Sequence, residues 1–434
     1  MGYLVRRLFA PIFCSQYLNQ QRSFQNLIAL KQPFSYVSIS EAWNRISGAA
    51  ISSLESEIVT VREAHNRILA KEVISPISIP ADDLTHYDGY AFRSVDTKNA
   101  HVQPVRLRVV DKAYPSQPPK FTIGDGEACY VTTGSALPRG SDTVLAVEMA
   151  ARMEGDLVQV RSRIDPGEHV IRAGSDIKKG EVVISAGRTL RPQDIMVLGL
   201  LKIDTVQVYK KPFVAIVSVG DELVDKAPTH SLLLSHWVQL SGGIPIDSGV
   251  APDDVVKIKR RVEAALTRAD VAITIGGCSM GEKDLVADAI NSVGKPGLVF
   301  HGIKMKPGRV SGFGVAMNKP IVMLPGFIHS TIVGFEFLVL PLLQQMRRLH
   351  PEGAWHIITA KLAEKIQFRS FIPFKNATFV RLERDHEGLM AYPLLGDSSF
   401  FGIVSKADGI VVAEENMTSI EKGETVSVHI LPGS

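Results

Sequence analysis

Cysteine is scarce in this chain, and the number and spacing of the cysteines exclude several classes of protein. Only three occur in 434 residues, at Cys14, Cys129 and Cys278. An odd, widely spaced set provides neither a disulfide framework nor the closely spaced ligand pairs of a zinc site. The cysteine content therefore fits a reducing compartment.

A strong charge imbalance and long apolar runs are also missing. Lys and Arg number 48 against 45 Asp and Glu, a net charge of +3 that is too balanced to predict a nucleic-acid partner. The longest apolar candidate, 320–346, is interrupted by Pro325, His329 and Glu336 and is better explained as a buried helix than as a membrane span. We therefore expect a cytoplasmic protein with no membrane span.

The N-terminal forty residues lack acidic side chains altogether. They contain Arg6, Arg7, Arg22 and Lys31 but no Asp or Glu. This composition is typical of a targeting peptide. An incorrectly assigned start, or a short amphipathic arm that docks on a neighbouring molecule, fits it too. We treat residues 1–36 as an N-terminal extension and leave import into an organelle open.

The remaining chain is too long for one hydrophobic core and divides by pattern into several domains. Ser38 or Ser40, followed by Glu41, predicts a helix cap, and VTVREAHNRILAKEV predicts a second helix. Short strands separated by Gly and Pro then follow. We predict a helical scaffold formed by 37–75 and 178–211, an inserted β domain over 76–177, an α/β domain over 212–349 and a C-terminal β domain over 350–434.

The predicted α/β domain alternates apolar strands with helices. PFVAIVSVG, PIDSGVA, VAITIGG and IVMLPG have the pattern of buried strands, and the segment after PIDSGVA places Val255, Ile258, Val262 and Leu266 on one helix face. Such alternation predicts a parallel, doubly wound sheet with helices on both faces. Ligands of these sheets bind beyond the carboxyl ends of the strands.

The segment VAITIGGCSMGEKDL, residues 271–285, combines a buried strand, a glycine turn and a helix start. Glycines let the backbone approach a ligand closely, and the N–H groups of the helix start face it, so this turn predicts an anion site. Glu282 and Asp284 lie in the first turn, where they favour the positive helix end or hold a divalent metal. A plain tight turn explains the glycines about equally well.

Three further loops follow predicted strands. The first contains Glu222, the second contains Lys304, Lys306 and Arg309 within six residues, and the third contains His329. Taken singly, they read as a helix-capping turn, a solvated loop and a packed histidine. Taken together, they predict an anionic ligand held by backbone N–H groups and cations, with acids nearby for a metal.

A series of motifs resembles one known family. SPISIPADDLTHYDGYAFRSVD is similar to the hallmark segment of the molybdopterin molybdenumtransferases, the family of bacterial MoeA and the C-terminal domain of gephyrin. The resemblance continues in order through VTTGSALPRGSDTVLAVE, IRAGSDIKKGEVVISAGRTLRPQDIMVLGLL, VSVGDEL, GGCSMGEKD, MKPGR, LPG and SSFFGIVSKADG, over about residues 37–434. It implies a multidomain α/β and β protein with a central doubly wound molybdopterin-binding domain, an inserted small β domain and a C-terminal β domain on an elongated scaffold.

The resemblance also implies a reaction. Members of the family cleave AMP from adenylylated molybdopterin and insert molybdenum from molybdate into the dithiolene, with Mg²⁺ or another divalent cation. They are homodimers whose active site lies between the α/β domain of one subunit and the inserted β domain of the other. A molybdopterin adenylyltransferase is the implied partner that supplies the adenylylated pterin.

Site residues follow from the motifs that match. The resemblance and the loop pattern give catalytic roles to Asp88, Asp176, Glu222, Asp284 and Lys306, with Glu222 and Asp284 also assigned to the metal. Substrate binding is assigned to Thr133, Gly276, Gly277, Ser279, Gly281, Lys304, Arg309 and Ser398. Several have ordinary alternatives, since Asp88 and Asp176 could equally cap turns.

The chain departs from the family pattern mainly in these loops. The segment after GDEL is short and lacks the family's Asp-x-Asn, and Arg309 stands where the family has Lys. Phe327 and Ile328 replace an Asn-Pro pair, and His86 and Tyr87 replace small residues. Arg differs from Lys in shape and hydration, so that exchange is not neutral at a tight oxyanion site.

Two hypotheses therefore stand. In the first, the chain is a divergent molybdenum-inserting enzyme, which the retained acids Glu222 and Asp284 favour. In the second, it is a non-catalytic paralogue that acts as a molybdopterin-binding carrier or a dimeric interaction scaffold, which the altered loops favour.

Overall fold

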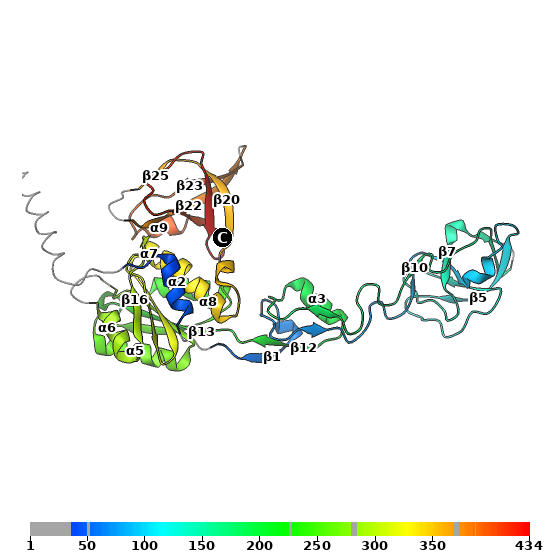
Figure 1. The fold of residues 1–434 in the computed structure, drawn as a ribbon, viewed down its shortest axis with the longest axis horizontal. Coiled ribbons are helices and arrows are strands. Elements are labelled where there is room, and N and C mark those ends of the chain that lie inside the picture. Colours follow the sequence, from blue (N-terminus) through cyan, green and yellow to red (C-terminus); the bar gives the residue numbers. More distant parts are fainter. Residues whose placement is uncertain are drawn as a thin grey trace, which may run out of the picture. The chain divides into compact units, whose positions relative to one another are not determined.

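The computed structural model describes residues 36–49, 53–153, 155–224, 228–278, 284–368, 373–386 and 388–434. Contacts divide the chain into two compact units, which Figure 1 shows as ribbons. The first unit consists of the described residues up to Glu55 together with Lys210–Ser434, and the second is Ser56–Tyr209. No helix in the described part of the chain is long and apolar enough to cross a membrane.

A six-stranded sheet forms the centre of the first unit. Its spatial order is β14 (Ile244–Ala251), β13 (Phe213–Val219), β15 (Val271–Ile275), β19 (Lys319–Leu324), β18 (Gly312–Ala316) and β16 (Gly297–His301). The first four of these strands are mutually parallel. The apolar runs of β13, β15 and β19 are buried on both sides of the sheet, as expected for parallel strands between helices, whereas the edge strand β14 is only partly buried.

Helices cover both faces of this sheet (Figure 1). One face packs against α5 (Val255–Arg268) and α6 (Leu285–Val293). The other packs against α2 (Ile39–Ser47), α4 (Thr229–Leu240), α7 (Ile328–Gly334), the π-helical turn η5 (Phe335–Val339) and α8 (Leu340–Met346). The doubly wound α/β fold predicted from the alternating pattern is therefore confirmed.

One strand of the sheet departs from the parallel arrangement that the sequence predicts. β18 runs antiparallel to both β19 and β16. It joins β19 through the two residues Met317 and Asn318, whose φ values are 53° and 58°. Such a turn suits a tight hairpin. The sequence pattern missed β18 because Gly312 and Gly314 interrupt its apolar run and weaken the strand signal.

The helix expected from its serine cap belongs to the first unit. The Oγ atom of Ser38 accepts a hydrogen bond from the backbone N–H of Glu41 at 3.1 Å, which confirms the predicted cap. Ala42 and Ile46 pack into the core of the α/β domain, and the indole of Trp43 donates to the carbonyl of Phe337. The packing of α2 thus places it with the α/β domain, whereas the sequence analysis grouped residues 37–75 with the scaffold.

The C-terminal residues form a closed β barrel. Strands β22 (Lys375–Asp385), β23 (Gly388–Pro393), β20 (Ile357–Leu362), β26 (Thr425–Ile430) and β24 (Gly409–Ala413) pair in that order, and β24 pairs back with β22. The short strand β17 (Met305–Lys306) of the α/β domain adds to the edge of β22. A small pair, β21 (Ile366–Gln367) and β25 (Ser419–Ile420), and the helix α9 (Phe401–Val404) complete the domain.

The second unit contains the predicted inserted β domain. Its sheet has the order β7 (Thr143–Ala146), β4 (Gly89–Phe92), β6 (Glu127–Val131), β5 (Val105–Ala113), β9 (Leu157–Val160) and β8 (Ala151–Arg152). The other strands form pairs, which are β1 (Ser56–Thr60) with β12 (Thr205–Tyr209), β2 (Val73–Ile74) with β11 (Val182–Ile184), and β3 (Leu84–Thr85) with β10 (Val170–Ile171). Helix α3 (Pro192–Leu200) packs near β1 and β12 in one apolar core.

The second helix predicted near the N-terminus, from VTVREAHNRILAKEV, is wrong. Residues 61–63 form a single turn of 3₁₀ helix, and Ile68 and Leu69 instead make β bridges to Thr189 and Val208. The spacing of apolar residues in this segment suits a helix, but their partners lie more than a hundred residues away. Pairing with distant strands therefore overrides the local pattern.

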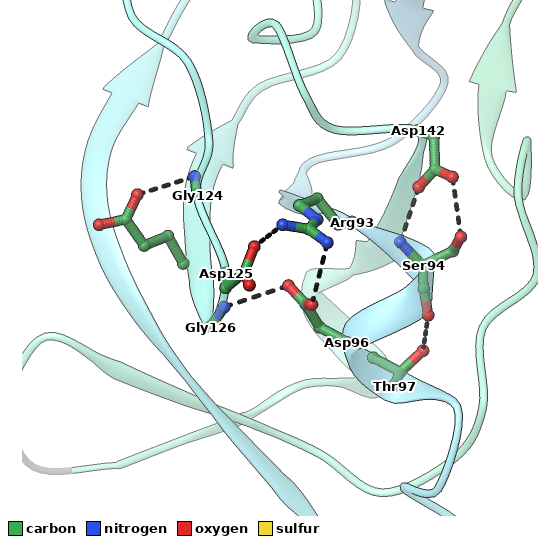
Figure 2. Close-up of polar contacts among 9 residues, drawn as sticks. Arg93, Ser94, Asp96, Thr97, Gly124, Asp125, Gly126 and Asp142 are labelled. Carbon is green, nitrogen blue, oxygen red and sulfur yellow. Dashed lines mark hydrogen bonds and ion pairs between the residues drawn. The ribbon is translucent and has the colours of Figure 1, made fainter.

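A polar network ties the loops of the inserted sheet together (Figure 2). Asp142 accepts hydrogen bonds from the N–H and hydroxyl of Ser94, at 2.7 and 2.8 Å. Arg93 forms an ion pair with Asp125, and the N–H of Gly126 donates to Asp96. Each carboxylate in this network accepts a hydrogen bond or forms an ion pair within the network, which indicates a structural rather than a catalytic role.

A buried carboxyl group lies in the π-helical turn η5. Glu336 exposes none of its surface, and both carboxylate oxygens lack a hydrogen-bond partner among the described residues. Burial raises the pKa of Glu336 to about 8. The folded protein therefore keeps this carboxyl protonated well above the pH at which the unfolded chain releases the proton.

We expect the first unit to lose stability between pH 6.5 and 8 because of Glu336. The unfolded carboxyl has lost its proton above about 4.5, whereas the folded one keeps it until about 8, so this contribution is complete below 4.5 and disappears as the pH rises. The contribution of Glu336 to the free energy of unfolding should fall by about 2 kcal/mol across this interval. Urea unfolding followed by tryptophan fluorescence measures it, since Trp43, Trp237 and Trp355 all lie in the first unit.

Glu336→Gln provides the matched control, because the amide has nearly the same shape and does not titrate. The buried histidines act in the opposite direction, since burial lowers the pKa of His429 to about 4 and also lowers that of His329 and His230. Both proteins contain these histidines, so the difference between the two stabilities removes their contribution. The free energy of unfolding of the wild-type protein minus that of Glu336→Gln should therefore fall by about 2 kcal/mol between pH 6.5 and 8. An equal decline in both proteins would contradict the assignment.

Candidate functional site

A cavity of about 980 Å³ lies in the first unit, between the carboxyl ends of the α/β strands and the C-terminal barrel. Its α/β side carries Glu222, Cys278, the segment 306–310 and the start of α7. Its barrel side carries Phe379, Leu394 and Ser398, among others. The position agrees with the general rule for ligands of doubly wound sheets, so we take this cavity as the candidate site.

Backbone hydrogen bonds fix the segment that carries the cations, residues 304–309, which we call the cationic loop. The N–H of Ile303 donates to the carbonyl of Arg309 at 2.9 Å, and the N–H of Ser311 donates to the carbonyl of Gly308 at 2.9 Å. On its other side, the N–H of Lys304 donates to the carbonyl of Val37 at 2.8 Å. The loop is therefore a closed, supported turn.

The structure separates the three cations of this loop. Lys306 and Arg309 line the cavity, are exposed, and form no ion pair within the described part of the chain. The ammonium of Lys304 instead lies 4.0 Å from the carboxylate of Glu415, and Lys304 is not among the residues that line the cavity. Two uncompensated cations at one end of a cavity attract an anion.

Tyr36 lies near Arg309 of the cationic loop. Its ring makes an edge contact with Phe374, with ring centroids 4.9 Å apart. Burial raises the pKa of Tyr36, and the nearby guanidinium of Arg309 partly opposes that shift. Tyr36 was not predicted as a site residue, because residues 1–36 were interpreted as an N-terminal extension.

Glu222 is the acidic residue at the cavity wall. It lies in the 3₁₀ turn η4 (Asp221–Leu223) directly after β13, as the position of its motif predicts. The neighbouring Asp221 is engaged elsewhere, since its carboxylate accepts from the N–H of Asp253 at 3.0 Å. Glu222 is thus the acid of this turn that can face a ligand.

Ser398 reaches the cavity from the barrel side, and His329 holds its segment in place. The N–H of His329 donates to the carbonyl of Ser398, and its Nε2 donates to the carbonyl of Phe400 at 2.9 Å. Burial lowers the pKa of His329. The hydrogen bond to Phe400 and the nearby Asp397 raise this pKa, but by less than burial lowers it. His329 is therefore a neutral structural link between α7 and the barrel near neutral pH.

Close packing alone explains why glycine occupies two positions of the turn after β15. A Cβ atom at Gly276 would lie 2.4 Å from the carbonyl oxygen of Val219, and one at Gly277 would lie 2.7 Å from side chains of Val219 and Val286. Both residues also have positive φ values, 88° and 64°. The N–H of Gly276 already donates to the carbonyl of Leu324. Ser279 and Gly281, the other residues predicted here, lie outside the described residues.

Among the described residues, Asp284 is not one of those that line the cavity. Its Oδ1 accepts from the N–H of Ala287 as the cap of α6, and its Oδ2 lies 2.7 Å from Nδ1 of His301. The other ring nitrogen of His301, Nε2, donates to the carbonyl of Val310 at 3.0 Å. His301 thus connects the α6 cap to the residue that follows Arg309. The sequence pattern did not predict this link, because both contacts depend on how the loops fold back on each other.

Cys278 lines the cavity but is unsuited to nucleophilic chemistry. Burial raises the pKa of its thiol well above the ordinary value, and the carboxylate of Asp284 adds to the shift. The sulfur also lies 3.3 Å from the carbonyl of Gly276, to which the thiol donates. A thiol held in its protonated form is a poor nucleophile.

The remaining predicted site residues belong to the second unit. The N–H and hydroxyl of Thr133 both donate to Oδ1 of Asp88, at 2.6 and 2.7 Å. These two hydrogen bonds lower the pKa of Asp88. The backbone N–H of Asp176 donates to the carbonyl of Ile79. The structure therefore brings Asp88 and Thr133 together as a pair, and their roles in the reaction stay predictions.

No group of three or more His, Cys, Asp or Glu side chains in the described ranges is arranged to hold a metal. Mg²⁺ does not need such a group, because it often binds one or two carboxylates together with substrate phosphates and water. Glu222, which lines the same cavity as Lys306 and Arg309, carries a single carboxylate of this kind. Both carboxylate oxygens of Asp284, by contrast, already have protein partners.

Fold and cavity together define a class: a multidomain α/β protein with a closed C-terminal barrel and a cavity, lined by two exposed cations, at its strand ends. Family models match three consecutive regions, described as the MoeA N-terminal region (domains I and II) over residues 37–201, a probable molybdopterin binding domain over 215–345 and the MoeA C-terminal region (domain IV) over 359–431. The chain belongs to the MoeA family.

Individual relatives agree with this assignment. The chain is 29% identical over 390 residues to the molybdopterin molybdenumtransferase of Haemophilus influenzae, covering 86% of this chain and 93% of that protein. It is 30% identical over 334 residues to molybdopterin molybdenumtransferase 2 of Mycobacterium tuberculosis, covering 72% and 82%. A crystal structure of a molybdopterin biosynthesis MoeA protein from Pyrococcus horikoshii superposes with a TM-score of 0.80 at 31% identity, over 92% of this chain and all of that one.

The separation of the three cations can be tested with pyrophosphate, a probe that has no ring. Lys306→Ala and Arg309→Ala should each weaken its binding about tenfold or more, since each removes a charged donor from the cavity. Lys304→Ala is the matched control, because the ammonium of Lys304 faces Glu415. Isothermal titration calorimetry measures all three. An equal loss in Lys304→Ala, or no loss in the other two, would contradict the geometry.

Proposed function

We propose that this protein inserts molybdenum from molybdate into adenylylated molybdopterin and releases AMP. The observation that carries the proposal is the cavity that joins Lys306, Arg309, Glu222 and Ser398 in a chain of the MoeA family. Molybdate and the phosphates of the pterin are anions, and both require cationic and hydrogen-bonding groups that are already in place. Relatives that match most of this chain are named as molybdopterin molybdenumtransferases.

The residues have separate roles in this proposal. Lys306 and Arg309 bind the oxyanions and neutralise charge that develops as the bond to AMP breaks. Ser398 donates a hydrogen bond from the barrel side of the cavity. Glu222 would hold Mg²⁺ together with phosphate oxygens of the substrate, and that ion would polarise the phosphate as a Lewis acid. In this proposal, Asp284 acts indirectly, by fixing His301 behind the cationic loop.

Residues of the inserted β domain are part of the proposal as well. We propose that Asp88, Thr133 and Asp176 take part in the reaction. We also propose that the protein is a homodimer, as its resemblance to the family implies. A molybdopterin adenylyltransferase would supply the adenylylated pterin, because the proposed substrate already carries AMP. The lowered pKa of Asp88 suits a group that must remain a carboxylate in the reaction.

A second candidate function is a molybdopterin-binding carrier or a dimeric scaffold. Exposed Phe327 and the apolar Ile328 at the start of α7, together with Val310 after the cationic loop, favour it. These residues replace polar or turn-forming positions of the family with apolar side chains. A carrier needs to bind the pterin but does not need to break its bond to AMP.

Release of AMP separates the two candidates. The purified protein is mixed with adenylylated molybdopterin, Mg²⁺ and molybdate, and then with tungstate in place of molybdate. Glu222→Gln should lower the rate of AMP release by about 100-fold, as expected for loss of a metal-binding or charged catalytic group. Unfolding followed by tryptophan fluorescence should stay unchanged, because Glu222 is exposed at the cavity wall.

The outcomes of this experiment distinguish the two candidate functions. Molybdate-dependent release of AMP that is lost in Glu222→Gln supports the enzyme. Tight binding of the pterin with no AMP release in the wild-type protein supports the carrier. AMP release that is equally fast in Glu222→Gln would overturn the role given to Glu222.

A further inference from the structure

Phe327 is an exposed aromatic side chain on the wall of the candidate site. It lines the same cavity as Lys306 and Arg309, yet 61% of its surface is accessible. The next residue, Ile328, is 3% exposed and packs into the core of the α/β domain. The fold therefore anchors α7 through Ile328, and Phe327 contributes little to the core.

The backbone of Phe327 is held firmly in place. Its carbonyl accepts hydrogen bonds from the N–H of Thr331 at 2.9 Å and from the Thr331 hydroxyl at 3.1 Å. The same hydroxyl donates to the carbonyl of Pro325 at 2.6 Å. These contacts fix the start of α7, so that the ring is presented on a rigid support.

The other two phenylalanines of the cavity are less available. Phe379 is only 2% exposed and is covered by the ring of His329, with centroids 4.7 Å apart. Phe368 is partly buried and lies beside the small strand pair of the barrel. Phe327 is thus the cavity phenylalanine whose ring is most open to a ligand.

We propose that Phe327 is a specificity residue that stacks against the planar nitrogen heterocycle of a phosphorylated ligand, whose anionic group binds Lys306 and Arg309. Flat heterocycles stack readily on aromatic rings, and the two cations supply the charge complement for the phosphate. A cavity of about 980 Å³ is large enough for both parts. This inference rests on the proposed function, whose substrate carries a pterin at one end and adenine at the other.

The test compares ligands with and without a ring, in the absence of molybdate and Mg²⁺. Calorimetric binding of AMP and of 6-hydroxymethylpterin monophosphate is measured beside that of pyrophosphate. Phe327→Leu should weaken a ring-bearing probe about five- to tenfold and leave pyrophosphate unchanged, and Phe327→Tyr should restore the binding. The probe that loses affinity identifies whether the pterin or the adenine stacks here.

Phe401→Leu is the matched control. Phe401 is about as exposed as Phe327, at 55%, but it lines a neighbouring cavity and not the candidate site. This variant should bind all three probes as the wild-type protein does. Light scattering of each variant then shows whether either ring affects the association of subunits.

Three results would overturn the inference. These are an unchanged affinity of Phe327→Leu for both ring-bearing probes, an equal loss of affinity for pyrophosphate, and an altered oligomeric state of Phe327→Leu with unchanged binding. Ring-specific loss in a protein that releases no AMP would support the inference while the proposed enzymatic function failed. AMP release by the wild-type protein, without a ring-specific loss of affinity in Phe327→Leu, would support the proposed function and contradict this inference.

Discussion

The backbone closure of residues 302–311 is the constraint on which the candidate site depends. Hydrogen bonds from Ile303 to Arg309 and from Ser311 to Gly308 bend this segment into a loop, and pairing with Val37 supports it from outside. The loop then places Lys306 and Arg309 at the cavity and directs Lys304 toward Glu415. Because Met305 and Lys306 also pair with β22, the loop joins the α/β domain to the barrel.

Much of the fold could be predicted from the sequence because it depends on local patterns. The buried strands of the α/β domain have continuous apolar runs, and α5 shows its apolar face at Ile258 and Val262. β18 was not predicted, because Gly312 and Gly314 weaken its strand pattern. The segment at Ile68 and Leu69 was misread as helix because its pairing partners are distant in sequence. In both cases tertiary pairing determined the structure.

The candidate site could be predicted only in outline. Glu222, Lys306, Arg309 and Ser398 meet at one cavity, as their positions at strand ends and in motifs suggested. The sequence could not separate Lys304 from Lys306, because Glu415 lies more than a hundred residues away. The engagement of Asp284 by His301 is likewise non-local.

The central proposal is that oxyanions bind at the cationic loop, beside Lys306 and Arg309. Crystals soaked in tungstate would test it most directly, because the anomalous signal of tungsten locates the ion. We expect a peak within hydrogen-bonding distance of Lys306 and Arg309. A peak beside Gly276 and Gly277, with none at the cationic loop, would contradict the claim.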